Sequence, residues 1–115
     1  MKKHLLFAAA FLAASAAPVL AHAFLQHASP GAGAVLSTPP KQVTLVFSEK
    51  LEPSFSGVSV SDGQGHDMEA GAPNFSEGTI IVILKPLSPG SYHVTWHAVS
   101  VDTHRTEGSY NFSVK

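Results

Sequence analysis

Apolar and polar residues alternate along three stretches of the chain, as they do in β-strands that bury one face. The stretches cover residues 43–48, 91–99 and 108–114. Side chains two positions apart lie on the same face of a strand, so one face of each stretch is predicted to enter the core. The predicted inward residues are Val43, Leu45 and Phe47, then Tyr92, Val94, Trp96 and Ala98, and finally Tyr110, Phe112 and Val114.

Shorter strands and turns account for the rest of the chain. Residues 22–28 and 58–61 form short extended segments, and the continuous β-branched run at 79–84 predicts a strand buried on both faces. Residues 63–78 predict a long polar loop with one weak strand. Glycine and proline mark turns at residues 29–33, 39–40, 62–65 and 86–90. Because no helical period follows the N-terminal segment, the pattern predicts one all-β domain, a two-sheet Greek-key sandwich or a small barrel.

The first 21 residues have the features of a secretory signal peptide. A short basic segment, 1–4, precedes an apolar run over 5–17, and the small residues at 19–21 allow cleavage after them. The apolar run is shorter than the about 20 residues that a transmembrane helix needs, and no later stretch could span a bilayer. We therefore expect an exported protein. Cleavage after Ala23 is an open alternative, because residues 21–23 read Ala-His-Ala.

Cleavage after Ala21 leaves a mature domain over residues 22–115. It has five Lys and Arg side chains against eight Asp and Glu, a net charge of −3 with neutral histidine. This charge argues against nucleic acid and against an anionic membrane surface as partners. The chain has no cysteine, so packing alone must hold the domain together. Any bound metal must use nitrogen and oxygen donors, with thioether as the only sulfur.

Two residue types that bind metals lie two positions apart after the second alternating stretch. In extended backbone Asp102 and His104 point to the same face and can converge on one ion. If His22 begins the mature chain, its free α-amine and its imidazole add two nitrogen donors that can chelate the same ion. This N, N, N, O set suits tetragonal Cu(II), which leads the divalent affinity series, although Zn(II) uses similar donors.

Several other residues have weaker claims on a metal. Glu49 follows the first alternating stretch, and it either supports a ligand by hydrogen bonding or is a solvated carboxylate. Strand alternation places His93 and His97 opposite the core face, so we expect them not to bind the ion. His66 and Met68, in the polar loop, are candidates for a second site.

Four segments resemble the CopC family of periplasmic copper-binding proteins, along the whole mature length. They are AHAFL at 21–25 with SP at 29–30, LVFSE at 45–49, LSPGSY at 87–92 and WHAVSVDTH at 96–104. The last segment, paired with a cleavage site just before a histidine, is specific, and the others support it.

The resemblance implies an Ig-like β-sandwich or barrel of Greek-key topology that binds one Cu(II) ion per chain. It implies that the amine and ring of His22 hold the ion together with Asp102 and His104. It also places Glu49 at an acidic position close to the site and Trp96 at an aromatic position packed near it.

Many members of the family also hold Cu(I) in a methionine-rich loop. The corresponding loop here has His66 and a single methionine, Met68. Soft Cu(I) prefers several sulfur donors, so the sequence argues against a Cu(I) site.

We therefore expect a periplasmic Cu(II) carrier or chaperone in copper homeostasis or resistance, and not an enzyme. The resemblance implies an inner-membrane CopD-type permease as its partner. Two other functions are open. A copper oxidase with an N-terminal histidine site would consume oxygen with a polysaccharide or a reducing agent. An adhesion or accessory sandwich that binds no metal would show no preference for Cu(II) over Zn(II).

Overall fold

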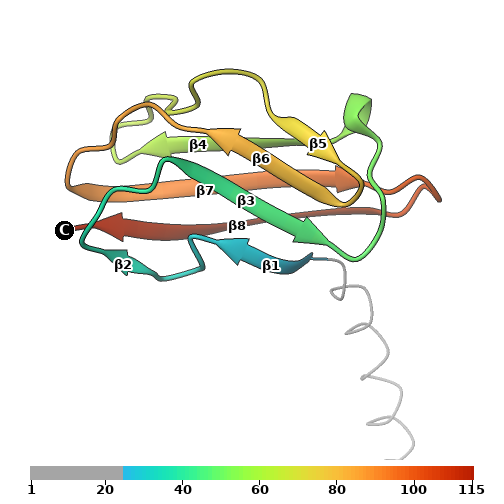
Figure 1. Cartoon of the computed structure of the whole chain (residues 1–115), viewed down its shortest axis with the longest axis horizontal. Coiled ribbons are helices and arrows are strands. Elements are labelled where there is room, and N and C mark those ends of the chain that lie inside the picture. The colour runs from blue at the N-terminus through green and yellow to red at the C-terminus, as the bar shows by residue number, and fades with distance from the viewer. Residues whose placement is uncertain (1–24) are drawn as a thin grey trace, which may run out of the picture.

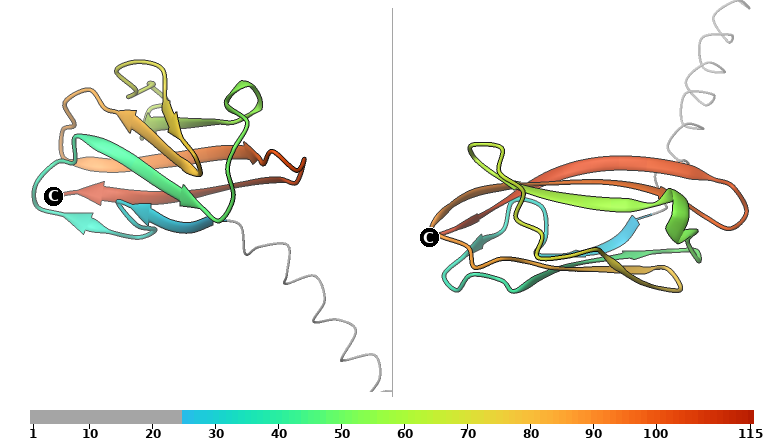
Figure 2. Two further views of the ribbon diagram at one scale, coloured as in Figure 1. Left: turned by 45° about the vertical axis from the view of Figure 1, so that its right-hand side comes forward. Right: turned by 90° about the horizontal axis from the view of Figure 1, so that it is seen from above.

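The computed structural model describes residues 25–115, which form two four-stranded β-sheets packed face to face (Figures 1 and 2). A short 3₁₀ helix, η3 (Pro53–Phe55), joins two of the strands. The strands are β1 (Leu25–Ser29), β2 (Val35–Leu36), β3 (Gln42–Phe47), β4 (Gly57–Asp62), β5 (Asn74–Ser76), β6 (Thr79–Ile83), β7 (Gly90–Val99) and β8 (Arg105–Val114).

The strand order is that of an immunoglobulin-like Greek key. One sheet has the order β1-β3-β6-β5 and the other the order β2-β8-β7-β4. These orders match the A-B-E-D sheet and the G-F-C sheet of Ig domains, with β2 added in parallel beside the end of β8. The predicted all-β, Ig-like Greek-key architecture is confirmed, in its sandwich form.

The core lies between the two sheets and uses the inward face of each alternating stretch. All the predicted inward residues belong to it except Tyr110, which is half-buried. Fully burying one aliphatic or aromatic side chain contributes about 1.5–3 kcal/mol, so many such contacts can hold the fold without a disulfide. The buried hydrophobic residues are Val43, Leu45, Phe47, Leu51, Val60, Ile80, Val82, Leu84, Leu87, Tyr92, Val94, Trp96, Ala98, Phe112 and Val114.

The prediction that residues 79–84 are buried on both faces is wrong. Ile80 and Val82 are fully buried, whereas the Ile83 side chain is 46% exposed and Ile81 is half-buried. β6 lies inside a sheet on whose second face the described residues place no further layer, so only alternate side chains reach the core. An unbroken apolar run could not reveal this difference.

The shortest strands were the hardest to predict. β2 has two residues and is paired only with the last part of β8, so it shows no alternation of its own. β5 is the weak strand predicted within residues 63–78, and β8 begins three residues before the predicted stretch. Near the start of β7, the Tyr92 hydroxyl donates to the Ser88 carbonyl at 2.5 Å, the tyrosine corner typical of Ig-like domains.

Two distant parts of the chain meet at one end of the sandwich. β7 and β8 form a long hairpin whose tip, residues 100–104, projects at this end, and the end of β3 lies there as well (Figures 1 and 2). The C-terminus lies at the opposite end (Figure 1). Within residues 25–115 no helix is both long and apolar enough to cross a membrane.

Candidate metal centre

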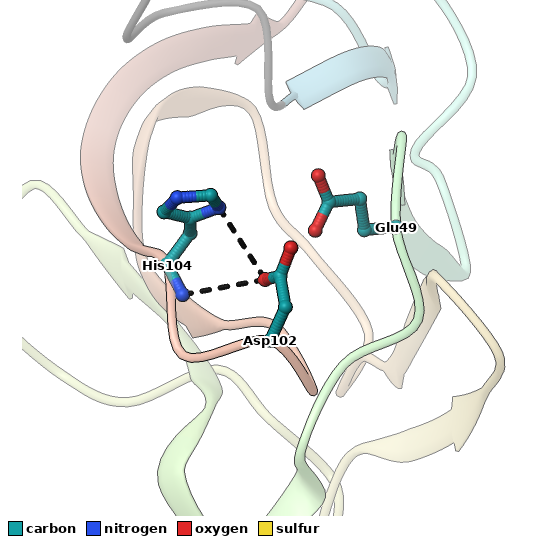
Figure 3. Close-up of side chains that lie close together, drawn as sticks. All are labelled: Glu49, Asp102 and His104. Atoms are coloured by element: carbon teal, nitrogen blue, oxygen red, sulfur yellow. Dashed lines mark hydrogen bonds and ion pairs between the residues drawn. The ribbon is translucent and has the colours of Figure 1, made fainter.

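The tip of the β7–β8 hairpin is a tight loop closed by backbone hydrogen bonds. The Ser100 N–H donates to the His104 carbonyl at 2.9 Å, and the Thr103 N–H donates to the Ser100 carbonyl at 2.8 Å. Thr103 has a positive φ of 74°, which turns the chain back toward β8. This turn holds Asp102 and His104 on the same side of the loop, so they converge through the turn and not through the extended backbone assumed from their spacing (Figure 3).

The Ser100 side chain lies beneath this loop and bonds to both candidate ligands. Its hydroxyl donates to Oδ1 of Asp102 and accepts the backbone N–H of His104 at 3.1 Å. Ser100 is fully buried, whereas the Asp102 and His104 side chains are 51% and 74% exposed. No pattern in the sequence singled out Ser100. The available signal was only its position two residues before Asp102.

Glu49 reaches the same loop because the segment after β3 runs antiparallel to the end of β7. The Glu52 N–H donates to the Val99 carbonyl at 2.8 Å, and the Val101 N–H donates to the Lys50 carbonyl at 3.0 Å. Leu51 and Ser100 form a β-bridge between these two bonds. These contacts join segments about fifty positions apart in the sequence.

Glu49, Asp102 and His104 together form a cluster of possible metal ligands. One side-chain donor atom from each lies within 4.8 Å of the others, and this is the one such cluster of three acidic or histidine residues within 25–115 (Figure 3). Nδ1 of His104 lies 3.3 Å from Oδ1 of Asp102. Glu49 is half-buried beside them, so two carboxylates and one imidazole face a common point that is open to solvent.

Asp102 is held in its charged form by its neighbours. The Ser100 hydroxyl, and after it the His104 backbone N–H, lower the pKa of the Asp102 carboxyl below its ordinary value. The carboxylate is therefore ready to bind a cation at neutral pH without first losing a proton. His22, the other predicted ligand, lies outside the described residues.

Trp96 lies in the core below the cluster. It is 8% exposed and packs edge to face on Phe47, with ring centroids 5.2 Å apart and the planes at 72°. Phe47 is the last residue of β3, two positions before Glu49. The indole thus supports the end of the strand from which Glu49 follows.

Three of the four other histidines of the described chain, at positions 66, 93 and 97, have surroundings away from the cluster. His93 and His97 are exposed on the outer face of β7, as strand alternation predicted, and Nδ1 of His93 lies 2.6 Å from Oδ1 of Asn111. His66 is exposed and its Nδ1 lies 3.0 Å from a carboxylate oxygen of Asp62. The His66 backbone N–H also donates to Asp62, and this hydrogen bond is the largest cause of the lowered pKa of Asp62.

The surroundings of Met68 do not favour the second metal site for which it was a candidate. Its side chain is half-buried and packs against the hydrophobic core, while the His66 ring is exposed and bonded to Asp62. A thioether committed to core packing is a poor surface ligand. The geometry therefore adds to the sequence argument against a Cu(I) site in this loop.

The fold and the cluster define an Ig-like β-sandwich with exposed oxygen and nitrogen donors at one end. The chain belongs to the CopC family, because the profile of the CopC domain matches residues 25–115. The resemblance carried by the four sequence segments is thereby confirmed.

Known proteins similar to this chain include a curated relative and two solved structures. Protein YobA of Escherichia coli strain K12 is 40% identical over 101 residues, which cover 84% of this chain and 82% of YobA. CopC from Methylosinus trichosporium OB3b is 32% identical with a TM-score of 0.73, covering 82% of this chain and 94% of that structure. PcoC, a methionine-rich copper resistance protein from Escherichia coli, is 34% identical with a TM-score of 0.68, covering 80% and 97%.

Proposed function

We propose that this protein binds one Cu(II) ion at the end of the sandwich where Asp102 and His104 converge, and carries it in copper homeostasis or resistance. The ligands are the α-amine and imidazole of His22, the Asp102 carboxylate and the His104 imidazole, with Glu49 beside them. The observation that carries this proposal is the cluster of Glu49, Asp102 and His104, whose donor atoms lie within 4.8 Å of one another.

The path of the chain supports the participation of His22. Leu25, the first described residue, pairs with Phe47, and Glu49 follows Phe47 by two positions. His22 precedes Leu25 by three positions, and three residues of fully extended chain span at most about 11 Å. This short separation from the end of β3 supports His22 as a ligand.

The donor chemistry favours Cu(II). An amine, two imidazoles and the Asp102 carboxylate are borderline and hard donors that suit tetragonal Cu(II). The carboxylates of Asp102 and Glu49 together offset the charge of a divalent ion. The exposure of the Asp102 and His104 side chains, 51% and 74%, suits an ion that is taken up and released. A carrier requires such exchange, and the copper resistance protein among the similar structures supports this class of function.

The expected signal peptide and the family resemblance support the periplasm as the place of action. We propose that the exported chain carries Cu(II) in the periplasm. Its resemblance to the CopC family supports an inner-membrane CopD-type permease as the protein that exchanges the ion with it. No catalytic step is part of this proposal.

The test begins with the protein purified from the periplasm after export. We expect its intact mass to show His22 as the first residue and a Cu(II) titration to reach one ion per chain, with N-rich tetragonal parameters in the electron paramagnetic resonance (EPR) spectrum. The matched control is the same domain with one alanine inserted before His22, which moves the amine away from the imidazole. We expect this variant to bind Cu(II) much more weakly.

Two results would contradict the proposal. One is a mature chain that begins at Phe24, which lacks the His22 imidazole. The other is equal Cu(II) affinity with and without the inserted alanine, which would remove the N-terminal amine from the site. Competition with Zn(II) in the same titration separates a copper site from a general divalent site.

A further inference from the structure

We propose that Ser100 is the positioning residue of the metal centre, which fixes Asp102 and His104 in their binding arrangement before the ion arrives. This inference rests on the proposed Cu(II) site and adds a residue that does not itself bind the ion. It also assigns the two oxygens of Asp102 to different tasks.

The burial of Ser100 is the first observation. Among residues 25–115 it is the one polar residue that is buried, with 0% of its surface exposed. A buried hydroxyl without hydrogen bonds is costly, so a serine at such a position needs partners. Both strong partners of its hydroxyl belong to proposed ligands: it donates to Oδ1 of Asp102 and accepts the His104 N–H at 3.1 Å.

The backbone of Ser100 contacts the same elements. Its N–H donates to the His104 carbonyl at 2.9 Å, and its carbonyl accepts the Thr103 N–H at 2.8 Å. Its β-bridge with Leu51 ties it to the segment that carries Glu49. One buried residue therefore sets the relative positions of all three members of the cluster.

The hydrogen bonds of Ser100 determine which oxygen of Asp102 is free. Oδ1 accepts the Ser100 hydroxyl and faces the His104 backbone N–H at 3.4 Å. Oδ2 has neither of these contacts, so the two hydrogen bonds leave it available to a metal. An exposed loop carboxylate would otherwise lose rotational freedom on binding, and fixing it in advance reduces that entropic cost.

Ser56 provides a matched control at the same end of the molecule. Its hydroxyl accepts the Val99 N–H at 3.0 Å and faces the Val99 carbonyl at 3.4 Å. It thus bonds to the same hairpin, one residue before Ser100, but touches no member of the cluster. Ser56→Ala removes a serine hydroxyl from this hairpin and leaves the ligand contacts intact.

The experiment compares wild type, Ser100→Ala, Ser100→Thr and Ser56→Ala. Each is measured at one fixed pH for Cu(II) affinity by chelator competition, for the Cu(II) EPR spectrum, and for urea unfolding of the metal-free protein. We expect Ser100→Ala to lose about 10–100-fold in affinity, as is typical when a residue that orients a ligand is removed, and to change the copper hyperfine splitting. Ser56→Ala should keep the wild-type affinity and spectrum even where its stability falls.

Ser100→Thr retains the hydroxyl and keeps the test decisive if Ser100→Ala does not fold. We expect the folded threonine variant to keep the wild-type spectrum. A folded Ser100→Ala with wild-type affinity and spectrum overturns the inference, and so does a threonine variant that behaves like alanine or an equal loss in Ser56→Ala. If wild type itself binds no Cu(II), the proposed function fails instead, so the two failures are distinguishable.

Discussion

Gly108 lies directly across from Trp96 in the β7–β8 register, and the indole occupies the space that a side chain at position 108 would need. A Cβ on Gly108 would come within 2.7 Å of Cζ2 of Trp96. The indole in turn packs on Phe47, at the end of the strand that leads to Glu49. The absence of a side chain at one position of β8 therefore lets a large aromatic ring connect the two sheets beneath the proposed metal site.

Substituting Gly108 tests this arrangement. We expect Gly108→Ala to lower the free energy of unfolding by about 1–3 kcal/mol, because the added methyl group overpacks the core against Trp96. Trp96 is the only tryptophan in the chain, so its fluorescence reports the displacement directly. Gly71→Ala is the control, since a Cβ there meets nothing within 4 Å. Equal stability of the two variants in urea unfolding would show that the indole is not confined.

Tyr110 and Tyr92 are predicted to respond in opposite ways to loss of the hydroxyl. The Tyr110 hydroxyl is buried and has no hydrogen-bond partner among the described residues, whereas the Tyr92 hydroxyl donates to Ser88. We expect Tyr110→Phe to leave stability unchanged or raise it, and Tyr92→Phe to lower it by about 0.5–1.5 kcal/mol. Thermal unfolding at pH 7 of the two variants checks both, and a marked loss in Tyr110→Phe would reveal a partner for that hydroxyl.

Alkaline pH should also destabilise the wild type through Tyr110. Burial raises the pKa of Tyr110 to about 12 from its ordinary value of 10.0. The unfolded chain loses this proton first, so stability is expected to fall as pH rises from about 10 toward about 12. Tyr110→Phe should show a smaller fall over this range. Parallel loss in both proteins, measured by urea unfolding at each pH, would assign the effect to other groups.

The proposed ligands are expected to differ sharply from the other histidines in a mutation series. His22→Ala, Asp102→Ala and His104→Ala should each weaken Cu(II) binding by at least about tenfold, because each removes a donor. His93→Ala and His97→Ala should have no effect, because both side chains lie on the outer face of β7. Isothermal titration with Cu(II) measures all five variants. Equal losses across them would indicate diffuse binding to surface histidines.

Copper binding should weaken steeply as pH falls from about 8 to about 5. Free imidazole has a pKa of about 6.5 and an α-amine one of about 7.7–8.0, and both groups must lose a proton before they bind metal. Asp102 does not contribute to this fall, because the Ser100 hydroxyl holds its pKa below the ordinary value of 3.8. Chelator competition at several pH values measures the profile. A flat profile would exclude ligation by the amine and the histidines.

Local patterns in the sequence determined the strands and part of the site. The alternation in 43–48, 91–99 and 108–114 identified the core faces, because a period of two leaves one face apolar whatever the strand pairs with. The spacing of Asp102 and His104 identified them as a candidate pair, but the turn at Thr103 is what holds them on one side of the loop. His22 depends on processing, and its participation stays a prediction.

Contacts between distant segments decided the rest. Glu49 is about fifty positions from Asp102, and only the backbone bonds between the segment after β3 and the end of β7 bring it to the cluster. From the sequence alone Ser100 is indistinguishable from an ordinary loop serine, and its burial depends on those contacts. The exposure of Ile83 depends on which face of its sheet is covered. The sequence determines which face of a strand is apolar. The pairing and layering of the strands determine which residues that face, and the ends of the strand, contact.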